Sequence, residues 1–527
     1  MKQFLFVLLG LLVLCYGAEA RADASSPDLW IYCPTNLQVD ANVDKLEALW
    51  TRASKAGYTR VMLADSKFGH LSDVPDHYFK NCARVKQIAE RLHLQIVPAV
   101  FPIGYSNDLL ENDPNLAEGV PVRDTLFEVT GGVGHVVADP PVKFDRVSFK
   151  DDSVAIDGNV ATVRAGQGVS RFVYKLKVKP FRCYHVSVSV QTQGIHGQPE
   201  VKVLAGDRSL NWANLGVKPT QNWTEHHAVF NSLDNTEVRI YFGIWSNPGG
   251  QLRWKNWKVE EVGLLNVLRR DGAPCVMKDE HTGKALEEGV DYEPIVDPHM
   301  GNVPWRGEYQ VWHEPPAIHT KLPDGTRLRV SWYYPPIVYD GQVAACISEP
   351  KTLQLLADQA KRMKQIWNAP LYMMEDDEFR VCNWDESCDK RHLTPGQMLA
   401  DNVKQCTDLL RPTRAATWND MFDPYHNAVK GPYYLVNGPW TGSWDGLDKS
   451  VLIVNWNYGK RDDSLKFFAD RGNEQVIAGY YDGDLSDWSN WLASAKKVHG
   501  IVGYMYTTWR GDYSKLEKFA EMARESR

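Results

Sequence analysis

The sequence predicts an α/β fold, a (β/α)8 barrel of the TIM type that is interrupted by an inserted antiparallel β-sandwich. Short apolar runs alternate with amphipathic helical segments at the start of the chain and again towards its end, as in parallel barrels. Between these regions, from residue 127 to residue 265, helical periodicity is absent and short alternating runs are separated by turn residues. Because the same pattern flanks this region on both sides, the sandwich is predicted to be an insertion in one barrel loop.

The chain begins with the pattern of a secretory signal peptide. Lys2 supplies a positive charge, Phe4 to Cys15 form an apolar stretch, and Ala18-Glu19-Ala20 is a small-residue cleavage site. The apolar stretch is too short for a membrane span, and no later run is long enough for one. We therefore expect a secreted or periplasmic protein with no membrane span.

Five parts of the chain follow from these changes in pattern. They are a signal peptide in residues 1–20, the first part of the barrel in 21–126, the sandwich in 127–265, an extended connection rich in Pro, Gly and charge in 266–326, and the remainder of the barrel in 327–527.

Nine segments have the pattern of barrel strands, one more than an eight-stranded barrel can use. They are Leu29 to Cys33, Arg60 to Ala64, Leu94 to Phe101, Arg327 to Tyr334, Leu371 to Met374, Ala415 to Met421, Ser450 to Asn457, Gln475 to Tyr481 and Ile501 to Thr508. One of them is therefore an extra edge strand or a wrong assignment.

The composition favours a carbohydrate as partner rather than a nucleic acid. The formal net charge is −7, and the chain has 19 Trp and 23 Tyr residues. Nucleic-acid binding needs a basic surface, so this charge argues against it. Aromatic side chains offer flat apolar faces on which sugar rings stack. No pattern in the chain indicates an oligomeric state.

Motifs for a cofactor or a metal are absent from the sequence. It has no Gly-rich phosphate loop, no HExxH pair, no nucleophile-elbow Ser and no CxxC pair. We therefore expect no cofactor and no metal. Cys382 and Cys388 are close enough in sequence to form a disulfide in an oxidising compartment, with two free thiols as the equal alternative.

The segment Pro370 to Trp384 is the strongest candidate for a catalytic centre. Leu371 to Met374 has the pattern of a buried strand, and four consecutive acids, Glu375 to Glu378, follow it. Barrel enzymes place catalytic carboxylates at the carboxyl ends of their strands. A solvated acidic turn is the alternative, and the buried strand directly before the acids favours an active site.

Other predicted strands also end in polar and aromatic residues, which would meet on the same rim. The expected substrate-binding residues are Trp332, Tyr334, Arg380, Trp418, Asp420, Trp456, Asn457, Asp482 and Trp509. A glycosidase needs one carboxylic acid to protonate the leaving oxygen and a second group to stabilise or attack the anomeric carbon. The pattern therefore predicts a glycoside hydrolase, with Asp377 and Glu378 as the catalytic residues and a carbohydrate as substrate.

Two short motifs resemble the family 20 glycoside hydrolases, the β-N-acetylhexosaminidases. Asp377-Glu378 follows one strand, Trp418-Asn419-Asp420-Met421 lies on a later strand, and Leu94 to Ser106 is similar to that family's third barrel strand. The resemblance implies that Glu378 is the general acid and that Asp377 orients the substrate's acetamido group, whose oxygen is the nucleophile. Glu375-Asp376 replaces the family's usual Gly-Gly, so an altered sugar specificity is an equal expectation.

The region 127–265 resembles the jelly-roll carbohydrate-binding modules in its strand pattern, notably in its last strand, RWKNWKVEEVGL. Its aromatic residues are candidates for stacking on sugar, or for packing the sandwich against the barrel. They are Trp212, Trp223, Trp245 and Trp254.

The mechanism stays open at this point. In a scheme with two carboxylates, Glu378 is the acid and either Asp482 or Asp420 faces it. A non-catalytic polysaccharide-binding protein would use the same acids only to bind sugar hydroxyl groups. A carbohydrate lyase or esterase is the third option.

Overall fold

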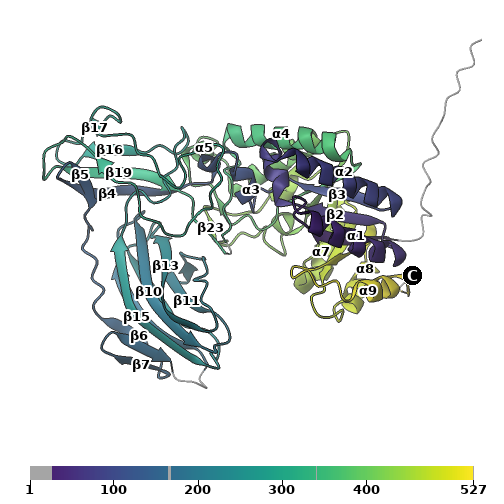
Figure 1. The fold of residues 1–527 in the computed structure, drawn as a ribbon, viewed down its shortest axis with the longest axis horizontal. Coiled ribbons are helices and arrows are strands. Elements are labelled where there is room, and N and C mark those ends of the chain that lie inside the picture. Colours follow the sequence, from purple (N-terminus) through teal and green to yellow (C-terminus); the bar gives the residue numbers. More distant parts are fainter. Residues whose placement is uncertain (1–26, 164–167, 340, 526–527) are drawn as a thin grey trace, which may run out of the picture.

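The centre of the protein is a closed barrel of eight parallel strands (Figure 1). The computed structural model describes residues 27–163, 168–339 and 341–525, so the predicted signal peptide lies outside the described residues. Around the barrel the strands are β1 (Asp28–Pro34), β2 (Arg60–Ala64), β3 (Gln95–Val100), β20 (Leu371–Met374), β22 (Arg414–Trp418), β24 (Leu452–Asn455), β25 (Gln475–Tyr480) and β26 (Ile501–Thr507). The predicted parallel barrel is thereby confirmed.

Helices cover most of the outer face of this barrel. They are α1 (Asp40–Lys55), α2 (Asp76–Arg91), α4 (Pro350–Trp367), α6 (Pro395–Leu410), α7 (Arg461–Arg471), α8 (Trp488–Ala495) and α9 (Leu516–Glu525). Between β22 and β24 the described chain has two short 3-10 helices, η3 (Asp420–Phe422) and η4 (Ser443–Gly446), in place of an α-helix. The outer layer is therefore incomplete for a (β/α)8 barrel.

Helix α4 shows how the sequence sets these elements. Leu356, Ala360 and Met363 recur at helical spacing, and all three are buried. Pro350 occupies the first turn, where its missing N–H is no loss, and Asn368 ends the helix in the left-handed conformation at φ 45°. The proline and the asparagine therefore mark where this helix begins and ends.

Side chains fill the interior of the barrel. Trp30, Met62, Met373 and Met505 belong to a cluster that is almost entirely buried. Partly buried aromatic residues continue this cluster at the carboxyl ends of the strands, among them Tyr32. The interior is thus a packed core, as in TIM-type barrels. Aromatic side chains extend this core towards the carboxyl ends of the strands.

Between β3 and α4 the chain leaves the barrel and forms two antiparallel modules. One is a β-sandwich with sheets in the order β13-β10-β15-β8-β7 and β12-β11-β14-β9-β6. Its strands are β6 (Val147–Lys150), β7 (Val154–Asp157), β8 (Val160–Val163), β9 (Ser170–Lys177), β10 (Cys183–Gln193), β11 (Pro199–Ala205), β12 (Arg208–Ser209), β13 (Gln221–Asn231), β14 (Glu237–Ile244) and β15 (Gln251–Glu261).

The second module is a six-stranded sheet in the order β17-β16-β19-β4-β5-β18. Its strands are β4 (Val120–Thr130), β5 (Val133–Val136), β16 (Val276–Asp279), β17 (Ala285–Leu286), β18 (Ile318–His319) and β19 (Arg327–Tyr334). The boundary expected after residue 126 therefore falls inside β4, and the expected extended connection 266–326 contributes three strands to this sheet.

Strand β19 corrects the prediction that Arg327 to Tyr334 belongs to the barrel. It pairs antiparallel with β4, with Arg327 opposite Glu128 and Tyr334 opposite Val120. Burial alternates along β19, which is typical of an antiparallel strand with one covered face rather than of a barrel strand buried on both faces. This strand is therefore the one candidate in excess of the eight barrel strands. After the insertion, the barrel resumes at α4.

The insertion leaves and rejoins the barrel at adjacent points. Ala117 and Ala345 form a β-bridge, the Glu118 N–H donates to the Ala344 carbonyl at 2.8 Å, and the Cys346 N–H donates to the Leu116 carbonyl at 2.9 Å. We call this paired segment the neck. Figure 1 shows the barrel at one end of the molecule and both antiparallel modules at the other, with α5 (Glu386–Asp389) near their junction.

The aromatic residues of the sandwich have different environments. Trp254 is fully buried in its core. Trp212 packs against Tyr434 of the barrel loops, with ring centroids 4.3 Å apart, as expected for a contact between sandwich and barrel. Trp223 and Trp245 are half-buried, and a lysine covers each ring. Lys255 Nζ lies 4.4 Å from the ring centroid of Trp223, and Lys202 Nζ lies 3.8 Å from that of Trp245.

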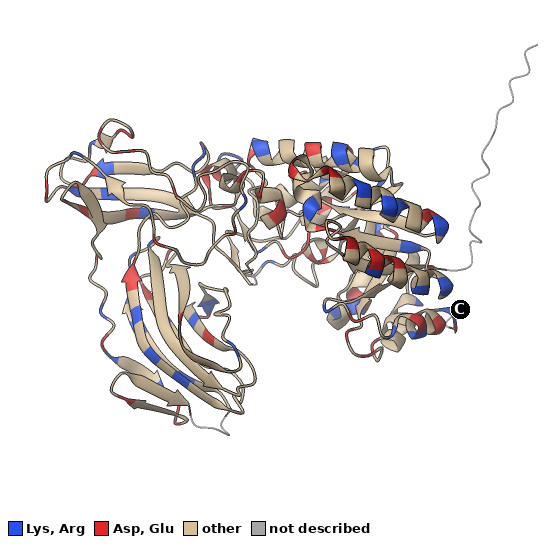
Figure 2. Cartoon of the chain, viewed as in Figure 1, with Lys and Arg blue, Asp and Glu red and all other residues tan. Residues whose placement is uncertain are grey.

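Charges of both signs are mixed over the outer helices of the barrel (Figure 2). Some form ion pairs between helices, such as Arg52 of α1 with Glu517 of α9 at 2.7 Å. Within the described ranges, no helix combines the length and apolarity that crossing a bilayer requires.

Candidate active site

A cavity of about 820 Å³ lies at the carboxyl ends of the barrel strands. Its volume is within the usual range for small-molecule sites. Its walls combine aromatic, acidic and small polar side chains. The lining residues are Tyr32, Pro34, Thr35, Asn36, Ala64, Asp65, Ser66, Phe68, Gly69, Pro102, Tyr105, Asp108, Gln359, Glu375, Asp377, Glu378, Trp418, Trp456 and Trp509.

The chain turns sharply at Glu378, just after β20. Glu378 has φ +47°, in the left-handed region that residues other than glycine adopt infrequently. Its N–H donates to Asp420 Oδ2 at 2.9 Å, and its carbonyl accepts from Gln342 Nε2 at 3.0 Å. Successive residues of an extended strand point to opposite faces. The turn therefore allows both Asp377 and Glu378 to line the cavity.

Gly104 makes this turn possible from the side of β3. A Cβ atom at Gly104 would lie 2.0 Å from the Asp377 carbonyl oxygen, so only glycine fits at this close backbone contact. Gln342 also donates to the Gly104 carbonyl at 2.9 Å. The loop after β3, the acidic segment and the chain returning from the insertion are thus tied together at one point.

Arg380 holds the Glu378 carboxylate. Arg380 Nη2 lies 2.6 Å from Glu378 Oε2, and the Tyr105 hydroxyl donates to the same oxygen at 2.5 Å. Arg380 also donates to the Tyr105 hydroxyl at 2.9 Å and to Gln342 Oε1. The guanidinium is buried and faces the ring of Tyr434, 4.9 Å from its centroid. An ion pair and a hydrogen bond to one oxygen therefore fix the position of this carboxyl group.

Neighbouring carboxyl groups on the cavity wall have raised pKa values. Burial, and then Asp420 and Glu375, raise the pKa of Asp377 well above its usual range. Burial, and then Asp108 and Asp376, raise the pKa of Glu375 to about 8. The pKa of Asp108 is raised to about 7, first by burial. The wall therefore combines buried carboxyl groups of raised pKa with one carboxyl group that pairs with arginine.

Aromatic rings form another part of the wall. The centroids of Tyr32 and Trp509 lie 5.3 Å apart, those of Tyr32 and Trp418 6.3 Å, and those of Trp418 and Trp509 6.0 Å. Trp456 packs edge-on against His426 at 4.4 Å. Trp509 is 51% exposed, so its ring is accessible to a ligand. These surfaces suit an apolar ring face.

Three other predicted site residues support the wall from behind. Asp420 is buried, holds the Glu378 N–H and accepts from Asn427 Nδ2 at 2.8 Å. Asn457 is buried and donates to Asp423 Oδ2 at 3.1 Å. Asp482 accepts the N–H of Trp509 at 2.9 Å. None of the three is among the residues that line the cavity.

Trp332 and Tyr334 lie outside the cavity. Both belong to β19, where Trp332 is 1% exposed and Tyr334 5% exposed. Their expected contact with substrate followed from assigning β19 to the barrel rim, and that assignment is wrong. Both side chains are part of the core of the insertion.

Several cavity residues carry no strand-end signal in the sequence. Asp108 lies in α3 (Asn107–Leu110), in the loop after β3, and Asn36 follows β1 by two residues. Gln359 reaches the cavity from α4, where its side chain bonds the Phe101 N–H at 3.0 Å and the Phe68 carbonyl at 2.8 Å. A polar residue within the apolar face of α4 was the available signal for Gln359.

Comparison with known proteins gives distant structural similarity only. No family model and no curated protein matches the sequence. A rhamnosidase from Novosphingobium sp. PP1Y is 11% identical over 96% of this chain, with a TM-score of 0.35; the match spans 59% of the rhamnosidase. A family 20 module of the pneumococcal exo-β-D-N-acetylglucosaminidase is 8% identical over 95% of this chain and 84% of its own, with a TM-score of 0.36.

Carbohydrate-binding modules are also among the similar structures. A family 4 carbohydrate-binding module is 16% identical over 22% of this chain and 77% of its own, with a TM-score of 0.17. The structural neighbours thus include glycoside hydrolases and carbohydrate-binding modules, at TM-scores below 0.5. The function is therefore inferred from the geometry of the cavity itself.

Proposed function

We propose that this chain is a glycoside hydrolase in which Asp377 and Glu378 act on a sugar bound in the cavity. The observation that supports this is that two adjacent carboxyl groups on the cavity wall have different surroundings. Arg380 forms an ion pair with Glu378, while burial and nearby acids raise the pKa of Asp377. Glycosidases need one protonated and one ionised carboxyl group at the scissile bond. The rings of Trp418 and Trp509 provide apolar faces for the sugar.

Asp377 is the proton donor in this proposal. Its raised pKa favours the protonated form, which a general acid must have. Glu378 then stabilises or attacks the anomeric carbon, with Arg380 and Tyr105 fixing its carboxylate. The substrate is a poly- or oligosaccharide, one ring of which packs against Trp418 and Trp509.

The reverse assignment is the alternative, and the motif resemblance favours it. Glu378 is then the general acid, and Asp377 orients an acetamido group of the substrate. This assignment requires that substrate binding releases Glu378 from Arg380 and allows it to gain a proton. It also predicts a preference for N-acetylhexosamines.

Leaving-group dependence tests the proposal and separates the two assignments. If Asp377 is the acid, Asp377→Asn lowers turnover of glycosides with poor leaving groups by about 10²–10⁴-fold and largely spares activated aryl glycosides. Glu378→Gln then impairs both substrate classes alike, because it acts at the anomeric carbon. The opposite pattern, strongest on acetamido sugars, assigns the acid to Glu378.

A matched control and two contrary outcomes complete this experiment. Asp358→Asn, on the exposed face of α4 where Asp358 pairs with Arg362, is expected to leave turnover unchanged. Wild-type activity in both Asp377→Asn and Glu378→Gln would rule out this segment as the catalytic centre. Sugar binding without turnover of any poly- or oligosaccharide or aryl glycoside would identify a polysaccharide-binding protein instead.

A further inference from the structure

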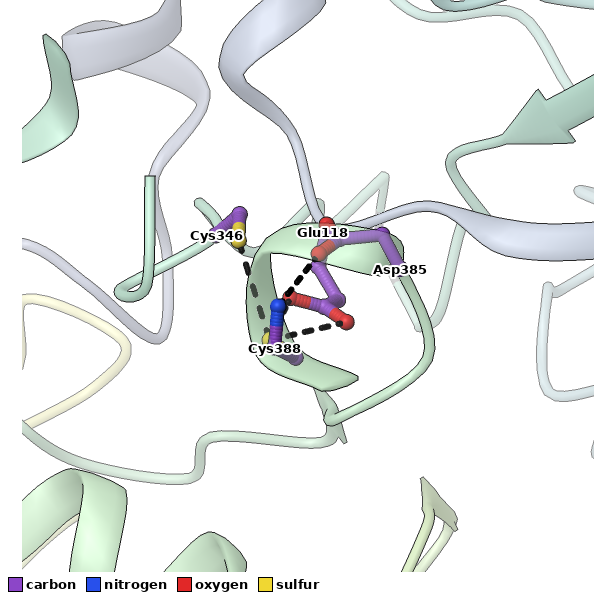
Figure 3. A group of neighbouring side chains, drawn as sticks. All are labelled: Glu118, Cys346, Asp385 and Cys388. Carbon is purple, nitrogen blue, oxygen red and sulfur yellow. Dashed lines mark hydrogen bonds between the residues drawn. The ribbon is translucent and has the colours of Figure 1, made fainter. Parts of the chain in front are cut away.

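A second cluster of polar side chains lies at the neck of the insertion, apart from the cavity (Figure 3). Glu118, Cys346, Asp385 and Cys388 each offer one atom that could bind a metal, and these atoms all lie within 4.8 Å of one another. None of the four residues is more than 1% exposed. Two cysteines and two acids so completely shielded from solvent need a common partner or a proton on most of them.

The distances in this cluster match the edges of a tetrahedral zinc site. Cys346 Sγ lies 3.8 Å from Cys388 Sγ, and Cys388 Sγ lies 3.5 Å from Glu118 Oε2. With Zn–S of about 2.3 Å and Zn–O of about 2.0 Å, a regular tetrahedron has S–S edges of about 3.8 Å and S–O edges of about 3.5 Å. These two edges therefore already have the length that such an ion requires, and the other ligand atoms lie within 4.8 Å.

Outer contacts orient both carboxylates. Glu118 Oε1 accepts the Trp384 N–H at 2.8 Å, which leaves Oε2 directed to the thiols. Asp385 Oδ1 accepts the Cys388 N–H at 3.0 Å, and Oδ2 accepts from Arg270 Nη2 at 2.5 Å. Hydrogen bonds of this kind hold the ligands of metal sites in place. Arg270, itself buried, also offsets part of the negative charge.

We propose that Glu118, Cys346, Asp385 and Cys388 bind one Zn²⁺ ion in a closed structural site. Four protein ligands leave no open position for water or substrate, as in structural rather than catalytic zinc sites. Two thiolates select zinc over magnesium and calcium, which take oxygen ligands. On binding, the two thiols release their protons to solvent.

The origin of the ligands defines what the ion does. Glu118 lies where the chain enters the insertion, Cys346 where it returns, and Asp385 and Cys388 lie at α5, shortly after the acidic segment. The ion therefore joins the neck to α5, which begins eight residues after Glu378. Sequence motifs do not reveal this site because its ligands are dispersed, with Glu118 and Cys388 separated by 270 positions.

Metal content of the purified full chain is the first test. Elemental analysis is expected to find about one zinc per chain in the wild type and a stoichiometric loss in the double variant Cys346→Ser/Cys388→Ser. Cys275→Ser, at a half-buried cysteine outside the cluster, is the control and is expected to keep its zinc. Wild-type protein that holds no zinc after purification with added Zn²⁺ would overturn the proposal.

A count of reactive thiols distinguishes bound zinc from a disulfide between Cys346 and Cys388. After denaturation with a chelator, a zinc-bound chain gives the same number of reactive thiols with and without prior reduction. A Cys346–Cys388 disulfide gives two fewer before reduction, together with no zinc, and would overturn the proposal.

Cobalt substitution keeps the test decisive if the double variant fails to fold. Wild-type protein stripped with a chelator and loaded with Co²⁺ is expected to show the thiolate charge-transfer and intense visible bands of tetrahedral coordination. Glu118→Gln, which preserves size, is expected to weaken Co²⁺ binding about 10–100-fold or more. Spectra of octahedral Co²⁺ without thiolate bands would contradict the assignment. None of these measurements uses turnover, so the zinc site and the proposed hydrolase activity are tested separately.

Discussion

Arg380 Nη2 lies 2.6 Å from Glu378 Oε2, so a buried guanidinium holds a cavity carboxylate that is only two positions away in sequence. This contact exists because the chain bends between the two residues, with Glu378 in the left-handed conformation. The Tyr105 hydroxyl completes it from the loop after β3. The position in which Glu378 meets a ligand therefore depends on a residue that does not itself line the cavity.

Replacing Arg380 by Met tests this dependence. The change removes the cation but keeps much of the apolar stem, so Glu378 and Tyr105 lose their shared partner. Turnover is expected to fall about 10²-fold or more, because a preorganised charge contact is lost at the reacting centre. Arg380→Lys keeps the charge without the planar fork and is expected to give an intermediate rate. Steady-state kcat and KM on an aryl glycoside provide the measurement.

The control for Arg380 lies on the outside of the barrel. Arg362 pairs with Asp358 on the surface of α4, and Arg362→Met is expected to leave kcat and KM unchanged. Wild-type turnover in Arg380→Met would show that the ion pair with Glu378 has no part in the reaction.

Trp509→Ala tests the aromatic wall. The indole is 51% exposed and lies 5.3 Å from Tyr32, so its removal opens the wall with little loss of core packing. Affinity for a bound oligosaccharide is expected to weaken by about 1–3 kcal/mol, the value of a large apolar contact. Titration calorimetry with a catalytically inactive variant measures this. Trp444→Ala, at a half-buried indole that packs against Phe467 outside the cavity, is the matched control, and an equal loss in both would place the binding surface elsewhere.

Glu375 makes the stability of the protein depend on pH. Burial raises its pKa from 4.5 to about 8 in the folded state. The folded protein therefore holds a proton that the unfolded chain has released, and this contribution to stability, present at low pH, is lost as the pH rises towards 8. Its slope is at most about 1.4 kcal/mol per pH unit, between about pH 4.5 and pH 8.

Glu375→Gln removes this titration and keeps the shape of the side chain. The variant is expected to become more stable relative to wild type as the pH rises from 5 to 8. Unfolding temperatures of both proteins at pH 5, 6, 7 and 8 provide the measurement. A stability difference that stays constant over this range would mean that Glu375 has no raised pKa in the folded protein.

The barrel could be predicted because its strands are buried on both faces. Leu371–Met374 and Leu452–Asn455 are buried at every position, and such strands appear in a sequence as unbroken apolar runs. Helix Pro350–Trp367 could be predicted from three sequence signals. A proline marks its start, apolar residues at helical spacing mark its buried face, and an asparagine marks its end.

Strand Arg327–Tyr334 was assigned wrongly although its sequence held the necessary signal. Leu328, Val330 and Trp332 are buried while the residues between them are not, and this period of two belongs to an antiparallel sheet. Its position after a long insertion suggests a return to the barrel, but its pairing with β4 shows that the alternation was the better guide. What the local sequence does not reveal is the partner strand, β4, because that strand is distant in sequence.

The candidate site could be predicted only where its residues follow strands directly. Asp377, Trp418 and Trp456 do so, and the structure brings them to one cavity. The contact between Tyr105 and Glu378 joins residues 273 positions apart and depends on the backbone turn, which no motif specifies. The distance between two such loops depends on the arrangement of the whole barrel, so the sequence of either loop alone does not predict it.

The bridge between Ala117 and Ala345 determines how the barrel is joined to everything inserted in it. Because the chain leaves and rejoins the barrel at neighbouring points, the two appended modules together form one long loop that this bridge closes. The entropy of closing a loop grows only with the logarithm of its length. A change in the length of the inserted modules therefore adds little to the entropy of closing this loop, as long as the paired junction is kept.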